Sequence, residues 1–294
     1  MKFRNLAFFL ALGISLTTFS QERHTVSKNK LKNVQREVVS KKTEARNETI
    51  EVGENDLYVV EKGVTHIGKV KLKKGARLQI KGKLILTDLQ ISSQGATISI
   101  NKGAVLKTDE EFLTDALFND YTRVVNYGYL SIYTWDFHGD LENHGMAVFK
   151  GGYLVVSEGS SITNHGTIKV GSAWFDVGSS FNNYAHFNTA SALVLNGETN
   201  NYGTIKTVEE DGHIYFDDQG THVLHERSRI VTKSLTADDI IQGPKDGGYA
   251  HIKVHHETKI TKVGVVLGNI NLCAFNTENC ERKGYIAPTV QECQ

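Results

Sequence analysis

Proline and cysteine are scarce in this chain, and hydrophobic runs of membrane-spanning length are absent from most of it. Only two prolines, Pro244 and Pro288, stand against 27 glycines in 294 residues. Proline removes a backbone donor from a strand ladder and glycine permits positive φ, so this balance favours many strands joined by tight turns. No segment after the first 20 residues is apolar enough to cross a bilayer, so we expect no transmembrane span in the mature chain.

An excess of charge is also lacking. Lys and Arg total 33, Asp and Glu total 33, and the formal net charge is zero. Because nothing in this balance favours contact with nucleic acid or an anionic membrane, we expect no nucleic-acid partner. The chain has no Walker loop, no dinucleotide fingerprint and no G-x-S-x-G motif, so we expect no cofactor, and the catalytic residues stay unknown.

The three cysteines, Cys273, Cys280 and Cys293, all lie near the C-terminal end. In an exported chain one pair can form a disulfide and leave one thiol over, and Cys273 with Cys280 is the first candidate pair, although the pairing stays open. A zinc site would need a fourth ligand and C-x-x-C spacing, and neither is present, so we expect no metal site. The cluster predicts a stapled C-terminal cap.

The N-terminus has the pattern of a secretory signal peptide over residues 1–20. Lys2 and Arg4 precede an apolar run over residues 6–16, which is short for a membrane span, although an uncleaved anchor is the alternative. We therefore expect an exported protein at the cell surface, in the periplasm or outside the cell. Residues 21–50 are polar and basic and predict a flexible or weakly helical leader.

A short motif, asparagine followed by Tyr or His and then Gly or Ala, recurs five times at intervals of 17, 21, 19 and 18 residues. Apolar residues stand two before and four after most of these asparagines, which is the period of a strand. Repeats of such length predict stacked coils. Strand parity places the asparagines on the inner side at a corner, where they can bond one another in a ladder: Asn126, Asn143, Asn164, Asn183 and Asn201.

The residue after each asparagine should face outward, which predicts an exposed column of rings about 4.8 Å apart. Such rings can stack on sugars or dock a partner protein. Alternatively they only stabilise the corner by stacking on one another, because repeats place like beside like. The candidate ligand-binding residues are Tyr127, His144, His165, Tyr184 and Tyr202.

The fold class that these patterns predict is all-β, a parallel β-helix or β-solenoid with coils of about 19 residues. The solenoid should cover residues 57–225 in about nine coils, roughly 40 Å long. Residues 226–294 should form an irregular β continuation and the cysteine-bearing cap. Residues 109–120 interrupt the pattern and predict a short helix or an excursion from the stack.

On its N-x-G-x-apolar-x-apolar repeat at the five asparagines, the chain resembles bacterial right-handed parallel β-helix proteins, especially exported surface proteins of the Bacteroidetes type. The resemblance implies export and adhesion or envelope roles, and in other members polysaccharide lyase or hydrolase activity. We therefore expect a cell-surface structural or binding module for a glycan or an envelope protein, more readily than an enzyme. A carbohydrate-active enzyme and a passive envelope scaffold are the alternatives, and the oligomeric state stays open.

Overall fold

The structure is a computed structural model that describes residues 36–39, 44–46, 48–91, 95–108, 118–133, 136–217, 219–274 and 280–293. The predicted signal peptide and most of the predicted leader lie outside these residues. Val34–Gln294 forms one compact unit. This unit is an all-β parallel solenoid of about 11 coils with a spacing of about 20 residues, and its described part contains no helix, which confirms the predicted fold class.

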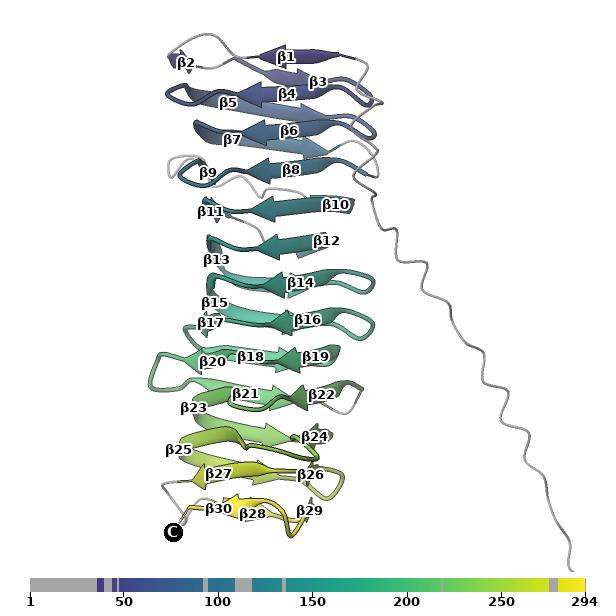
Figure 1. The fold of residues 1–294 in the computed structure, drawn as a ribbon, viewed down its shortest axis with the longest axis vertical. Coiled ribbons are helices and arrows are strands. Elements are labelled where there is room, and N and C mark those ends of the chain that lie inside the picture. The colour runs from purple at the N-terminus through teal and green to yellow at the C-terminus, as the bar shows by residue number, and fades with distance from the viewer. Residues whose placement is uncertain are drawn as a thin grey trace, which may run out of the picture. The chain divides into compact units, whose positions relative to one another are not determined.

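Each regular coil contributes three strand segments, and equivalent segments of successive coils pair in parallel to build three faces (Figure 1). The first face contains the strands that lead to the repeated asparagines. The chain then turns a first corner onto the second face, continues onto the third face, and returns to the first. Six long strands run from the second face onto the third: β5 (Thr65–Leu72), β7 (Lys83–Ile91), β13 (Met146–Val156), β15 (Thr167–Phe175), β23 (Arg229–Ala237) and β25 (Ala250–Ile260).

The other strands belong mainly to one face each. Those of the first face are β1 (Glu37–Val39), β4 (Leu57–Val60), β6 (Arg77–Ile80), β8 (Thr97–Ile100), β14 (Ser161–Asn164), β16 (Ser180–Asn183), β19 (Glu198–Asn201), β22 (Thr221–Leu224), β24 (Ile240–Gln242), β26 (Val265–Leu267) and β29 (Tyr285–Ile286). Two further strands enter the first face from the third: β10 (Phe118–Asn126) and β12 (Asp136–Asn143). Those of the second face are β2 (Glu44–Arg46), β9 (Val105–Thr108), β11 (Tyr129–Ile132), β17 (His186–Thr189), β20 (Thr204–Thr207), β27 (Ile270–Ala274) and β30 (Gln291–Glu292). Those of the third face are β3 (Ile50–Val52), β18 (Ala192–Leu195), β21 (His213–Phe216) and β28 (Cys280–Arg282).

The core fills the space between the three faces. Strand after strand alternates buried and less buried positions, as in β6 and β14, because successive side chains point to opposite sides of the sheet. Middle coils bury phenylalanines, and the rings of Phe175 and Phe181 stack with their centroids 4.6 Å apart. A single coil cannot cover its own inner side, so each coil depends on its neighbours for burial.

Strands begin earlier in the chain than the sequence predicts. β1, β2 and the first residue of β3, Ile50, lie within the segment for which we predicted a leader, and β1 pairs with β4 in the regular parallel register. Parallel pairing likewise continues beyond residue 225, from β23 to β30. Weak local patterns suffice at these ends because a neighbouring coil supplies the pairing partner. The predicted break over residues 109–120 lies largely outside the described residues, and β10 begins at Phe118.

Candidate functional site

The five repeated asparagines form a buried hydrogen-bonded ladder at the first corner. Their strands pair so that each asparagine lies directly beside the next. In each pair Nδ2 donates to the Oδ1 of the following asparagine, at distances between 2.7 and 2.9 Å. All five side chains are fully buried. A buried amide without partners would cost free energy, so the ladder explains why the same residue recurs.

Backbone groups complete the ladder. The Nδ2 of Asn126 also donates to the Met146 carbonyl at 3.0 Å, and its Oδ1 accepts from the Gly128 amide at 3.0 Å. At the last position the Nδ2 of Asn201 donates to the Arg229 carbonyl at 3.4 Å. These bonds occupy the amides within the corner, so the ladder is a structural element beneath the candidate site.

The glycine of the motif is needed for close approach of stacked coils. A Cβ at Gly145 would lie 2.1 Å from the Gly128 carbonyl oxygen, and a Cβ at Gly166 would lie 2.1 Å from the Gly145 oxygen. None of these three glycines has positive φ. The glycine is therefore required by the close packing of the corner and not by a left-handed turn conformation.

The five outward residues of the motif stack in one column along the first corner. Ring centroids lie 4.5 Å apart for Tyr127 and His144, 4.8 Å for His144 and His165, and 4.6 Å for the next two pairs, with interplanar angles of at most 13°. A sixth ring, that of His225, stacks on Tyr202 with centroids 3.6 Å apart. We call these six residues the ring column: Tyr127, His144, His165, Tyr184, Tyr202 and His225.

Sequence reasoning missed His225 because Leu224 takes the place of the asparagine before it. His225 nevertheless lies one coil beyond Tyr202, since Leu224 pairs with Asn201. Burial lowers the pKa of His225. His222, three residues earlier, is fully buried on the inner side. The two histidines therefore point to opposite sides of the strand, as expected for positions three residues apart.

The ring column exposes ring edges, since each inner ring is covered on both faces by its neighbours. Tyr127, Tyr184 and Tyr202 are 50%, 43% and 41% exposed. Their hydroxyls make no hydrogen bond with the described residues. Because the π-faces stack on one another, a sugar cannot stack on the inner rings. The groups available to a ligand are the tyrosine hydroxyls and the edges of the imidazoles.

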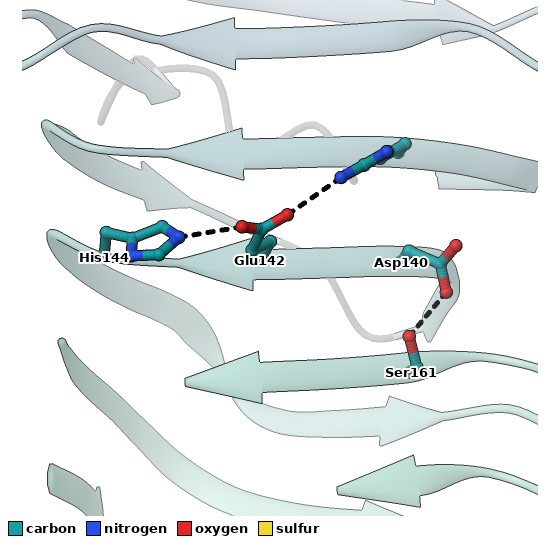
Figure 2. Close-up of polar contacts among 5 residues, drawn as sticks. Asp140, Glu142, His144 and Ser161 are labelled. Carbon is teal, nitrogen blue, oxygen red and sulfur yellow. Dashed lines mark hydrogen bonds and ion pairs between the residues drawn. The ribbon is translucent and has the colours of Figure 1, made fainter. Parts of the chain in front are cut away.

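A charged cluster adjoins the ring column on the first face (Figure 2). Glu142 accepts from His144 Nε2 at 2.8 Å and from Arg123 Nη2 at 2.9 Å. These hydrogen bonds, first that of His144 and then that of Arg123, hold the pKa of Glu142 below its usual value. Two residues before Glu142 and farther from the corner, Asp140 accepts from the Ser161 hydroxyl of the next coil. The cluster fixes the orientation of the His144 imidazole within the stack.

The candidate disulfide is corrected by the structure. Cys273 is bonded to Cys293, and Cys280 is outside that bond. Cys273 lies in β27 and Cys293 follows β30, the strand that pairs with β27 on the second face, whereas Cys280 lies in β28 on the third face. The coil therefore brings the more distant cysteine next to Cys273. Among the described residues, no group of three or more His, Cys, Asp or Glu side chains could hold a metal ion.

Comparisons of the chain with protein-family models, with curated proteins and with solved structures found no match. Within the part of the chain that the structure describes, no helix has the length and apolar character of a membrane span.

Proposed function

We propose that this protein is an exported cell-surface binding module that holds an extended glycan along the first corner. The observation that carries the proposal is the ring column, in which three exposed tyrosine hydroxyls lie along one line of stacked coils and make no hydrogen bond with the described residues. A polymer with repeated hydroxyl groups can form a hydrogen bond at several coils at once. Each bond is weak by itself, so binding would depend on their number.

Export is supported by two features that are independent of the ring column. The first 20 residues have the basic and apolar regions of a signal peptide. The second feature is the Cys273–Cys293 disulfide, since disulfides form and persist in oxidising compartments. Mass spectrometry of the exported protein should show a mature chain that begins at Gln21.

The test of ligand binding removes the hydroxyls and keeps the rings. A glycan array identifies a bound glycan, and its affinity is then measured for the variant Tyr127→Phe/Tyr184→Phe/Tyr202→Phe. We expect binding to weaken about ten-fold or more, since each lost hydrogen bond is worth about 0.5–1.5 kcal/mol. The melting temperature should not change, because phenylalanine preserves the stack.

The matched control replaces two exposed tyrosines away from the ring column, as Tyr215→Phe/Tyr285→Phe. This control should bind as the wild type does. If the three-residue variant also binds as the wild type does, the hydroxyl edge is not the contact surface and the proposal is wrong. Cleavage of the bound glycan would instead favour a lyase or hydrolase, and failure to bind any glycan would favour a passive scaffold or a protein partner.

A further inference from the structure

A recess lined with lysines lies on the first corner in the coils that precede Tyr127. Two four-residue turns border it, 61–64 and 101–104, each closed by a backbone hydrogen bond, from Val64 to Glu61 at 3.0 Å and from Ala104 to Asn101 at 2.9 Å. The corner between them contains only Lys81 and Gly82. Because the longer turns project further than the short one, they leave a recess of about 520 Å³ between them.

The lining of this recess is basic and contains no acidic residue. Its four lysines are Lys62, Lys81, Lys83 and Lys102. Lys81 pairs with Glu61 at 3.0 Å. Within the described residues the other three ammonium groups have no ion pair and no hydrogen bond. Three positive charges that are unpaired within the described residues therefore line a concave space.

Two turn glycines also line this recess. Gly63 and Gly103, the third residues of the two turns, have φ of 81° and 79°, and a Cβ at either position would meet nothing within 4 Å. Their amides make no hydrogen bond with the described part of the chain. Unpaired amides in turns of this kind form concavities suited to anions. The recess therefore combines ammonium groups and backbone N–H donors.

The recess continues directly into the ring column. The Tyr127 amide donates to the Ile100 carbonyl at 2.8 Å, and the Tyr129 amide donates to the Ala104 carbonyl at 3.0 Å. The turn that closes the recess and the first ring of the column thus belong to adjacent coils on one corner. A ligand that follows this corner passes from one to the other.

We propose that the recess binds the acidic groups, carboxylates or sulfate esters, of the glycan that lies along the ring column. This inference rests on the proposed function and specifies its ligand as an acidic polysaccharide. Carboxylates and sulfates accept charge-assisted hydrogen bonds from lysine, which are stronger than neutral ones. Since the lysines are exposed, salt should weaken the interaction.

The test neutralises the three unpaired lysines in the full chain, as Lys62→Gln/Lys83→Gln/Lys102→Gln. The control removes the same charge from other surface positions, as Lys169→Gln/Lys206→Gln/Lys233→Gln. Calorimetric titration with oligogalacturonate, dextran sulfate and neutral dextran measures binding at low and high salt. We expect the affinity of the recess variant for at least one acidic probe to fall by about ten-fold or more, and its binding to depend less on salt. The control should behave as the wild type.

The outcomes separate the two proposals. Wild-type affinity of the recess variant for both acidic probes would overturn the recess as a binding site. Weaker binding of that variant, together with unchanged binding of the three-residue tyrosine variant, would support the recess and contradict the ring column. Inorganic sulfate is then tested as a competitor at the same total concentration of sulfate groups as dextran sulfate. If it binds the recess as strongly as dextran sulfate does, the site takes a free anion, and the glycan part of the inference is wrong.

Discussion

At the scale of single residues, the repeated asparagine and the ring after it have different roles. Asn164 illustrates the first, since it accepts from Asn143 and donates to Asn183 within a buried corner. Tyr184 illustrates the second, since it stacks on His165 and Tyr202 and still exposes its hydroxyl. Two adjacent residues thus serve the fold and the outer surface.

We predict that Asn164→Ala destabilises the stack. The substitution leaves the Oδ1 of Asn183 without the donor that it now has, at a cost of about 2–3 kcal/mol. The melting temperature should fall by about 5–10 °C, as measured by circular dichroism. The control, Asn188→Ala, changes an outer asparagine whose side chain makes no hydrogen bond with the described residues. Equal melting temperatures for the two variants would contradict a stabilising ladder.

At the scale of elements, the last coils depend on a covalent link more than the middle ones do. The final strands are short, for example β29 with two residues, so they add few backbone hydrogen bonds. The Cys273–Cys293 bond closes a loop with a sequence separation of 20. It connects β27 to the residue after its pairing partner β30 and so holds the last coil in register.

We predict that Cys293→Ser opens the C-terminal coil and leaves the rest of the solenoid folded. Closing a loop of this length contributes on the order of 3 kcal/mol by restricting the unfolded chain. Hydrogen exchange read by mass spectrometry should become faster in β27, β28 and β30 and stay unchanged in β14 and β16. Cys280→Ser keeps the bond and serves as the control. Unchanged exchange in β27 would show that pairing alone holds this end.

At the scale of the whole molecule, two buried histidines in widely separated coils connect the stability of the solenoid to pH. His66 in β5 donates from Nε2 to the Glu48 carbonyl at 3.1 Å, and His222 in β22 packs edge-on against Phe216. Burial lowers the pKa of both imidazoles. In the unfolded chain these histidines take up protons near their ordinary pKa of 6.5, whereas in the folded chain they do so only at lower pH. Stability is therefore lost as the pH falls below about 6.5.

We predict a melting temperature that is lower at pH 5.5 than at pH 7.5, by about 2–4 °C for each kcal/mol of stability lost. In His66→Leu/His222→Leu this difference should shrink, whatever the melting temperature at pH 7.5. The control, His186→Gln/His256→Gln, replaces two exposed histidines and should keep the wild-type difference. A pH difference that is the same in both variants would show that other groups cause it.

The sequence predicted the structure of the middle coils better than that of the two ends. The inward asparagines and outward rings follow from strand parity and a nearly constant repeat, both of which are visible in the chain. The first and last residues of the solenoid cannot be predicted in this way. β1 and β30 have little alternation of apolar and polar residues, and they are strands because each pairs with a strand of the neighbouring coil. His225 was missed for a related reason, since its place in the ring column depends on the register of β22 against β19.

The sequence by itself determines the coiled all-β fold, because side chains alternate along a strand and a short repeat must stack to bury its inner side. Tertiary structure alone decides the pairing of Cys273, the covering of the ring faces and the recess beside Lys83. These depend on distances between successive coils and on corners of unequal length. The reason is physical: a repeat specifies which side of a strand a residue occupies, and only the stacked coils specify what lies next to it.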